Sequence, residues 1–168
     1  MSKKPFVTIR PAKLFDAEAI ANIYNEAILT TTATFDTKTK SITDREAWLK
    51  SHDDRHPVLV AVVNGEVAGW ACLTSWSSRH AYDETAETSL YVFARHQGRG
   101  IGRKLNNAII AEAARLKYHT LIARISQESQ ASVHLNQQAG FVHIGTMKQV
   151  GRKFGKLLDV HIMQKMME

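Results

Sequence analysis

A glycine-rich turn between a strand and a helix constrains this chain more than any other feature. Residues 87–102 read ETSLYVFARHQGRGIG: an apolar strand carrying one carboxylate, Glu87, leads into the turn Q-x-x-G-x-G at residues 97–102. Apolar residues at helical spacing follow the turn directly. Glycines let backbone amides approach a ligand closely, and the unpaired amides at a helix N-terminus bind phosphate groups well. The segment therefore predicts an anion-binding site beside a potential general base.

Two familiar phosphate-binding motifs fail on spacing. Walker A requires G-x-x-x-x-G-K-[ST], and no glycine of this chain has that partner. A dinucleotide fingerprint requires a third glycine where Arg103 stands and an acidic residue about twenty positions on, where residues 119–125 have none. An ordinary strand-to-helix turn, whose glycines only relieve crowding, remains as the alternative.

Length and composition describe an ordinary globular chain. With 168 residues, 44% hydrophobic and 23% charged, the sequence fits one domain over residues 1–168. No segment approaches the roughly eighteen consecutive apolar residues of a membrane span, and the polar residues 1–5 lack the apolar run of a signal peptide. The single Cys72 fits a reducing compartment and lies in an apolar segment typical of a buried strand. We therefore expect a cytoplasmic protein with no membrane partner and a core thiol.

The positive charge does not indicate a nucleic-acid partner. The formal net charge is +6 and the pI is about 9.5, but the basic residues form no run longer than two and accompany no nucleic-acid motif. Such a field would equally attract a polyanionic cofactor. His52 and His56 have the i, i+4 spacing of helical zinc ligands, yet the pattern is not H-E-x-x-H and no third ligand is obvious. We expect neither nucleic acid nor metal.

Periodicity and turn signals predict the element order β-α-α-β-β-β-α-β-α-β-β. Asp16 is a predicted N-cap, Thr43 and Glu46 form a predicted capping box, and Asn64-Gly65 indicates a hairpin. The predicted strands are residues 6–10, 58–63, 66–75, 85–93, 120–125, 141–150 and 157–163, and the predicted helices are residues 17–28, 43–52, 101–116 and 129–138. This pattern predicts a mixed α/β fold, with a mostly antiparallel sheet of six to seven strands, about four helices, and a ligand crevice beside the glycine turn.

Further segments carry a resemblance to a known family. The turn, preceded by Leu90-Tyr91-Val92 and followed by Ala139-Gly140-Phe141, resembles the acetyl-CoA site of the GCN5-related N-acetyltransferases (GNAT). Residues 9–28, 81–92 and 150–160 are similar to the phosphinothricin and methionine sulfoximine acetyltransferase branch, so the resemblance covers nearly the whole chain. It implies a GNAT-like fold, acetyl-CoA as co-substrate, a small amine as acceptor and a homodimer.

The resemblance also implies which residues contact the cofactor. In this family the amides of the turn hold the CoA pyrophosphate, and the pantetheine arm lies along the preceding strand. By position, the implied contacts are Leu90, Tyr91, Val92, Gln97, Gly98, Arg99, Gly100, Ile101, Gly102 and Arg103. Ser129 stands where relatives often carry an asparagine that touches CoA, and Asn136 where some carry a histidine proposed to assist catalysis. We expect Ser129 and Asn136 to line the cofactor site, and no histidine role carries over.

Glu87 is the predicted general base. The family transfers acetyl directly to an amine, and a protonated amine has no lone pair, so its proton must leave before attack. Glu87 matches the glutamate of the T-A-E segment of the branch, although a glutamate in water at a strand edge is the alternative. No general acid for the departing thiolate is evident.

The predicted acceptor is a small amino acid or analogue of the phosphinothricin, methionine sulfoximine or methionine sulfone type. Arg79 is the predicted partner of its carboxylate, because a guanidinium matches two carboxylate oxygens and the loop of residues 75–84 precedes Glu87. Phe35, Trp76 and Tyr82 are predicted apolar walls of the pocket. Two alternatives remain open: acetylation of another amine, such as a polyamine, an antibiotic or a protein N-terminus, and a non-catalytic acyl-CoA-binding module.

Overall fold

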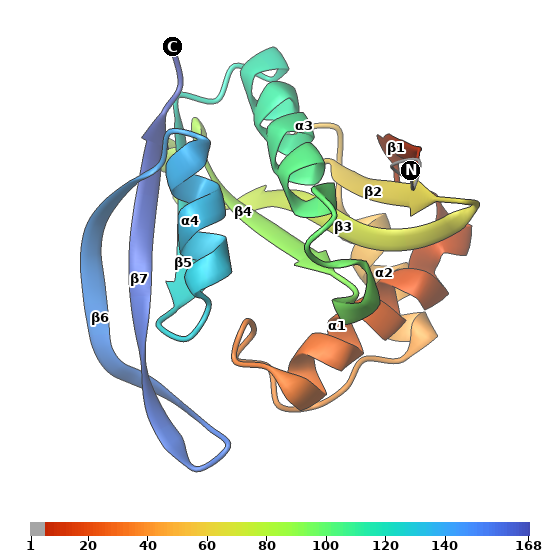
Figure 1. Cartoon of the computed structure of the whole chain (residues 1–168). Helices are drawn as coiled ribbons and strands as arrows, with labels where there is room; N and C mark the ends of the chain where they lie inside the picture. Colours follow the sequence, from red (N-terminus) through yellow and green to blue (C-terminus); the bar gives the residue numbers. More distant parts are fainter. Residues whose placement is uncertain (1–5) are drawn as a thin grey trace, which may run out of the picture.

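The computed structural model describes residues 6–168 and shows a seven-stranded sheet with helices on both faces (Figure 1). The strands are β1 Val7–Pro11, β2 Val58–Val63, β3 Glu66–Ser75, β4 Thr85–Val92, β5 Thr120–Ser126, β6 Val142–Lys153 and β7 Lys156–Met166. The helices are α1 Ala17–Thr30, α2 Ile42–Ser51, α3 Ile101–Arg115 and α4 Gln130–Gln138, with short 3-10 turns η1 Leu14–Asp16, η2 His80–Tyr82 and η3 Ala94–His96. The predicted element order and fold class are confirmed. The prediction for residues 1–5 lies outside the described residues.

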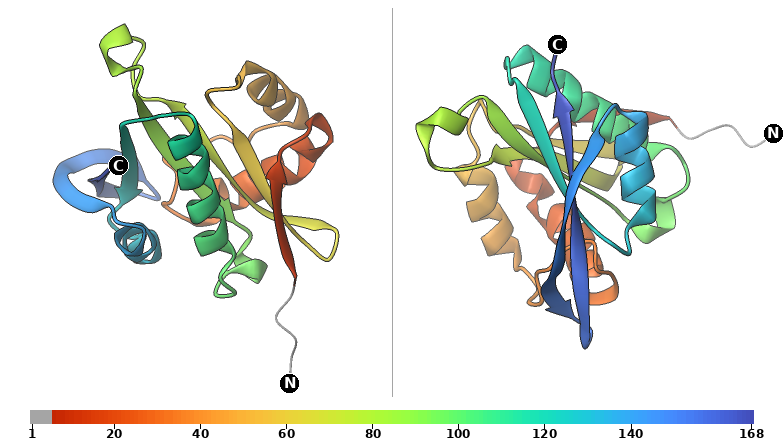
Figure 2. Two further views of the ribbon diagram at one scale, coloured as in Figure 1. Left: turned by 90° about the horizontal axis from the view of Figure 1, so that it is seen from above. Right: turned by 90° about the vertical axis from the view of Figure 1, so that its left-hand side faces the viewer.

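Strand β3 shows how the sequence sorts side chains between the two faces. Trp70 and Cys72 pack with the α1 side chains Ile20 and Ile23. The alternating residues Ala71 and Leu73 pack instead in the cluster that contains α3. Successive side chains of a strand point to opposite faces, so a strand covered on both sides is apolar throughout. Helices α3 and α4 thus lie on one face, and α1 and α2 on the other (Figure 2).

Cys72 belongs to this core. Its residue is 2% exposed, and burial raises the pKa of its thiol to about 12. The prediction of a core thiol is confirmed. None of the helices within residues 6–168 is both long and apolar enough to cross a membrane.

The sheet order is β1-β2-β3-β4-β5-β7-β6, and β4 and β5 are its one parallel pair within the described chain. Their ladder has only three residue pairs, from Thr85 opposite Thr120 to Glu87 opposite Ile122. Beyond Glu87, β4 continues on β3 and β5 continues on β7. The two strands therefore separate in the middle of the sheet, and this split positions the site.

The predicted start of α1, with Asp16 at the N-cap position before Ala17, is confirmed, but the side-chain cap expected there and the capping box predicted for α2 were wrong. Asp16 does not cap α1 with its side chain: its carboxylate accepts from the Lys13 amide at 2.7 Å and pairs with Arg10 at 2.7 Å. The cap of α2 is Ser41, which accepts from the Asp44 amide at 3.0 Å, two residues before the predicted box. Asn64 and Gly65 have φ values of 50° and 83°, so the predicted hairpin turn is confirmed.

Candidate active site

A hollow opens where β4 and β5 separate. Its lining comes from both strands, from helices α3 and α4, and from one residue after α1. The lining residues are Ala33, Thr88, Ser89, Leu90, Tyr91, Asn106, Ala123, Arg124, Ile125, Ser126, Ser129, Ser132, Leu135 and Asn136. Because paired strands would fill this space with hydrogen bonds, the short β4–β5 ladder is what makes the hollow.

The glycine turn lies at the end of β4 and begins α3. Gly98 and Gly100 have φ values of 74° and 80°, a left-handed conformation that glycine adopts without steric cost. A Cβ on either glycine would meet no atom of the described chain within 4 Å, so one side of the turn is open. Gln97 donates from its side chain to the Val92 carbonyl at 3.0 Å and ties the turn to the strand. The turn therefore leaves open space next to the N-terminus of α3, where the first amides of a helix have no intrahelical partner and favour an anion.

The other predicted cofactor residues are divided between the two faces of the sheet, the core and the surface. Leu90 and Val92 pack against the α3 core cluster, whereas Tyr91 packs on the α1 side. Ile101 is fully buried, so only its backbone is available to a ligand, while Arg99 and Arg103 are exposed. The structure thus brings the turn and the strand together, with the two arginines on the surface of the turn.

Two asparagine side chains that line the hollow each have one buried polar atom without a partner in the described residues. Asn136 Nδ2 donates to the Ser132 carbonyl at 2.9 Å, but its buried Oδ1 accepts from nothing in the described residues. Asn106 Nδ2 is likewise buried and unpaired. Buried polar atoms are normally satisfied, so each exception needs an explanation, and a polar ligand is a direct one. Ser129, at the start of α4, lines the same hollow.

Glu87 does not stand free in water. Arg124 of β5 donates from Nε to Oε1 at 2.7 Å and from Nη2 to Oε2 at 2.8 Å, forming a two-pronged ion pair. The Glu87 side chain is 15% exposed and that of Arg124 is 51% exposed. Bonding to Glu87 also raises the pKa of Arg124 above its already high value. The alternative of a glutamate in open water does not describe this arrangement.

Sequence reasoning missed Arg124 and Asn106, although each left a signal. Arg124 interrupts the otherwise apolar strand β5, and Asn106 is the polar neighbour of Leu105 on the buried face of α3. A charged or amide side chain at an otherwise apolar position is unusual in a protein core. Such residues indicate places where the interior must interact with something polar.

The predicted acceptor residues are only partly gathered at Glu87. Trp76 lies under the guanidinium of Arg124, which is 5.8 Å from the ring centroid. Phe35 packs so closely on Gly151 of β6 that a Cβ there would overlap its ring. Arg79 and Tyr82 are exposed around η2, and within residues 6–168 neither forms a hydrogen bond or ion pair with Glu87.

The loop after α1 bridges the two separated strands. Thr32 bonds to the Ser126 hydroxyl of β5 at 3.0 Å, and the Ala33 carbonyl accepts from the Tyr91 hydroxyl of β4 at 3.5 Å. Lys153 of β6, which is 4% exposed, donates to the Thr34 carbonyl at 2.7 Å. Burial lowers the pKa of Lys153. These contacts fix the loop over one mouth of the split.

The chain belongs to the GNAT family of acetyltransferases: residues 9–162 match the family described as "Acetyltransferase (GNAT) domain". It is 43% identical over 159 residues to the L-amino acid N-acyltransferase MnaT of Escherichia coli K12, covering 94% of this chain and 92% of the relative. It is 41% identical over 159 residues to an L-methionine sulfoximine/L-methionine sulfone acetyltransferase of Salmonella typhimurium, with 94% and 93% covered. The predicted family and enzyme class are confirmed.

Two further comparisons agree. A phosphinothricin N-acetyltransferase of Streptomyces coelicolor is 34% identical over 158 residues, with 92% of each chain covered. The solved structure of an acetyltransferase from Salmonella typhimurium superimposes with a TM-score of 0.93 at 40% identity, over 96% of this chain and 94% of that one. That structure contains its cofactor acetyl-CoA, which is the cofactor predicted for this chain. Within the part of the chain that the structure describes, no group of three or more His, Cys, Asp or Glu side chains is arranged to hold a metal ion.

Proposed function

We propose that this N-acetyltransferase moves the acetyl group of acetyl-CoA to the α-amine of a small amino acid or analogue of the phosphinothricin, methionine sulfoximine or methionine sulfone type. The split between β4 and β5 is the observation that carries the proposal. The hollow at this split is lined by residues of both faces of the sheet. The glycine turn and the side chains of Asn106 and Asn136 lie on the face of α3 and α4, and the Glu87 carboxylate lies on the face of α1. The names of the relatives support this class of acceptor.

The donor side of the split fits acetyl-CoA. The left-handed Gly98 and Gly100 leave the first amides of α3 open for the pyrophosphate, and exposed Arg99 and Arg103 are placed to neutralise phosphate charge. Along residues 88–92, the edge of β4 that faces β5 is not paired with it. The amide-containing pantetheine arm can therefore form hydrogen bonds along this edge. When bound, acetyl-CoA supplies an activated thioester whose leaving group is a thiolate.

Asn106 and Asn136 strengthen this fit. Asn106 has a buried donor without a partner, and Asn136 has a buried acceptor without one. An amide-bearing chain passing through the hollow offers a carbonyl to the first and an N–H to the second. We therefore propose that both residues, with Ser129 beside them, hold the pantetheine arm.

On the acceptor side, we propose that Glu87 removes a proton from the substrate ammonium. The freed lone pair attacks the acetyl carbonyl and the new N–C bond forms. The C–S bond then breaks with its electron pair on the departing CoA thiolate, and the nitrogen loses its second proton to solvent, which leaves a neutral amide. The carboxylate retains the proton and later releases it to solvent. The 15% exposure of the Glu87 side chain supports the role, because the group is shielded yet reachable. Arg79 stays the predicted partner of the acceptor carboxylate, and Phe35, Trp76 and Tyr82 stay the predicted walls.

A homodimer is part of the proposal. Strand β6 ends the sheet order, and its side chains Val142, Ile144 and Val150 are exposed. An edge strand that exposes apolar side chains is a surface that proteins often cover. Analytical ultracentrifugation checks this, with a dimer expected at micromolar concentration. The location of the protein in the cytoplasm remains a prediction.

A thiol-release assay tests the function. The protein is mixed with acetyl-CoA and one acceptor from a panel of amino acids, sulfoximines, sulfones, phosphinothricin and polyamines, and free CoA is titrated with a chromogenic disulfide. Cys72 will not interfere, because it is the single cysteine of the sequence, is buried and has a pKa raised to about 12. We expect the amino-acid analogues to be the best acceptors. Preference for polyamines would contradict the acceptor assignment, and acetyl-CoA binding without turnover would show a non-catalytic module.

A further inference from the structure

Arg124 lies on the acceptor side of the sheet. Its neighbours Ala123 and Ile125 pack in the core cluster that contains α3, so alternation along β5 directs Arg124 to the opposite face. Ser126, which shares that face, bonds to Thr32 in the loop after α1. Arg124 lines the hollow between β4 and β5. The guanidinium is therefore placed across the sheet from the proposed pantetheine site.

The guanidinium has hydrogen-bond donors to spare. A guanidinium carries five N–H donors, and Arg124 uses one on Nε and one on Nη2 for Glu87. Within residues 6–168 nothing else accepts from Arg124, so three donors, including both on Nη1, remain. With its side chain 51% exposed, these donors are accessible to a small ligand.

The ion pair needs a reason beyond stability. An exposed ion pair contributes only about 0–1 kcal/mol to folding, and a cation beside a carboxylate weakens it as a base. A second Arg–Glu pair in this chain, Arg115 with Glu112 at 2.8 Å, lies on the surface of α3. The Glu87–Arg124 pair differs because it joins two separating strands at the mouth of the hollow.

We propose that Arg124 binds the carboxylate of the acceptor amino acid, so that Glu87 and Arg124 together recognise the zwitterion. This inference rests on the proposed function. An α-amino acid presents an ammonium and a carboxylate one carbon apart, and the protein presents a carboxylate and a guanidinium in direct contact. Opposite charges then meet at both ends, with the substrate nitrogen directed to Glu87. Trp76, under the Arg124 guanidinium, limits the movement of its plane.

The test measures a preference, because removing Arg124 also changes the surroundings of Glu87. Two acceptors are compared by kcat/KM: methionine sulfone and its carboxamide. The carboxamide keeps the amine and the side chain but lacks the negative charge of the carboxylate. The proteins are wild type, Arg124→Met, Arg124→Lys and, as matched control, Arg115→Met, which breaks the ion pair on α3. Dividing the two kcat/KM values cancels effects on Glu87 that are common to both acceptors.

We expect wild type and Arg115→Met to prefer methionine sulfone over its carboxamide by at least tenfold in kcat/KM. In Arg124→Met this preference should fall to about twofold or less, and the loss should appear mainly in KM. Arg124→Lys should keep part of the preference, because it retains the charge but not the fork. The affinity for acetyl-CoA, measured by calorimetry, should change less than twofold in every variant. If Arg124→Met does not fold, Arg124→Lys is used in its place, and its ratio of kcat/KM for methionine sulfone to kcat/KM for the carboxamide should be lower than that of wild type.

An unchanged preference in a folded Arg124 variant overturns the inference alone. If Arg79→Met loses the preference and Arg124→Met keeps it, the acceptor carboxylate is assigned to Arg79 instead. A wild-type protein that acetylates amines but no amino acid overturns the proposed function and this inference with it. The three failures are therefore distinguishable.

Discussion

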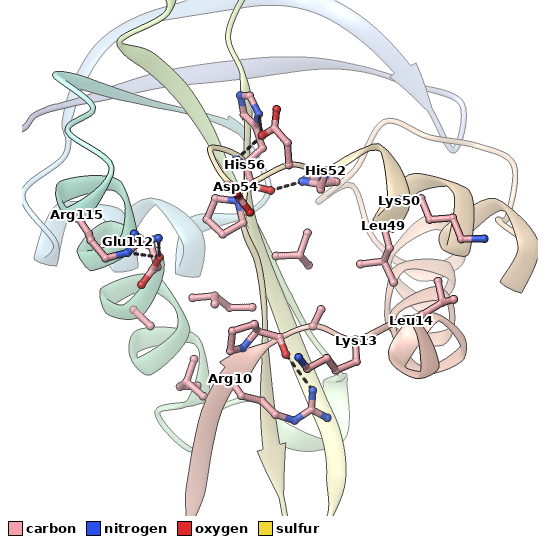
Figure 3. A pocket seen from close by; sticks show the side chains of 18 of the residues that line it. Arg10, Lys13, Leu14, Leu49, Lys50, His52, Asp54, His56, Glu112 and Arg115 are labelled. Atoms are coloured by element: carbon pink, nitrogen blue, oxygen red, sulfur yellow. Dashed lines mark hydrogen bonds and ion pairs between the residues drawn. The ribbon is translucent and has the colours of Figure 1, made fainter.

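Two hollows within residues 6–168 differ in size and in lining, and we propose the smaller one as the site. A groove of ≈ 880 Å³ runs beside edge strand β1, between the end of α2 and the exposed face of α3 (Figure 3). The hollow between β4 and β5 has a volume of only ≈ 70 Å³. In the large groove two charged side chains that line it, Glu112 and Arg115, pair with each other at 2.8 Å. In the small hollow Asn106 and Asn136 keep buried polar atoms without partners.

This difference shows what identifies a site. A large volume shows only that side chains do not fill the space, which is common at the edge of a sheet. A buried polar atom without a partner carries a free-energy cost of about 1–3 kcal/mol, and in the described residues Arg45 Nε, Trp70 Nε1 and His96 Nδ1 also lack a partner away from this hollow. What supports a polar ligand in the small hollow is that two such atoms line the same space. The small hollow also lies where a ladder ends early, while the described part of β1 is paired to β2 along its whole length.

Gly100→Val should have the largest effect. A β-branched side chain beside the first amides of α3 fills the space that the pyrophosphate needs, so acetyl-CoA binding should fall below detection in calorimetry. The left-handed backbone adds about 1–2 kcal/mol of strain. Gly65→Val is the matched control, since Gly65 has φ 83° against 80° and equally open surroundings. Both variants should lose similar thermal stability, and unchanged acetyl-CoA affinity in folded Gly100→Val would refute the turn as the cofactor site.

Glu87→Gln should lower kcat by about a hundredfold or more at neutral pH, the usual scale for losing a general base. The loss should shrink at high pH, where free amine is already abundant, and acetyl-CoA affinity should hold. Glu112→Gln removes the carboxylate of the Arg–Glu pair on α3 and should leave kcat unchanged. Steady-state rates from pH 6 to 10 measure both, and full activity of Glu87→Gln at pH 7 would mean a structural role.

Arg79→Ala should raise KM for methionine sulfoximine or phosphinothricin at least tenfold if Arg79, rather than Arg124, holds the acceptor carboxylate, and should leave this KM unchanged if Arg124 holds it. Losing a charge-assisted hydrogen bond costs about 1.5–3 kcal/mol. KM for acetyl-CoA should stay nearly constant. The exposure of Arg79 makes this effect smaller and more salt-dependent than those above. An unaltered acceptor KM would remove Arg79 from the pocket.

Filling the large groove should have the smallest effect. Ala111 is exposed on α3 and lines the groove, so Ala111→Phe occupies space there at a helix-propensity cost of about 0.5 kcal/mol. We expect both kcat and the two KM values to remain within twofold of wild type. A tenfold loss would show that the groove takes part in catalysis and would reverse the comparison between the hollows.

Much of the fold follows from the sequence because its signals are local. Helical spacing, the Asn64-Gly65 hairpin and the glycine turn each depend on residues close in the chain, and the predicted order of elements is confirmed. Helix starts were less certain. Ser41 and Thr43 both suit an N-cap, and Asp16 is used by Arg10 instead, which only tertiary structure decides.

The site could be predicted only in part, for a related reason. The turn and Glu87 lie in one segment, but Arg124 meets Glu87 across 37 positions of sequence, through the register that sets Glu87 opposite Ile122. No local pattern fixes the register of a parallel pair joined by a helix. The contact of Thr32 with Ser126 depends on the same register. Loop residues such as Arg79 are harder still, since nothing local fixes the path of the segment that carries them.

The short ladder between β4 and β5 has a consequence for hydrogen exchange. Beyond Glu87, the backbone N–H groups of β4 that point away from β3 have no strand to donate to, so their hydrogens should exchange with solvent while those facing β3 stay protected. A ligand lying along this edge would slow them selectively. An isotope-exchange map of residues 88–92 would then report binding without any turnover, and would separate a protein that holds its donor from one that uses it.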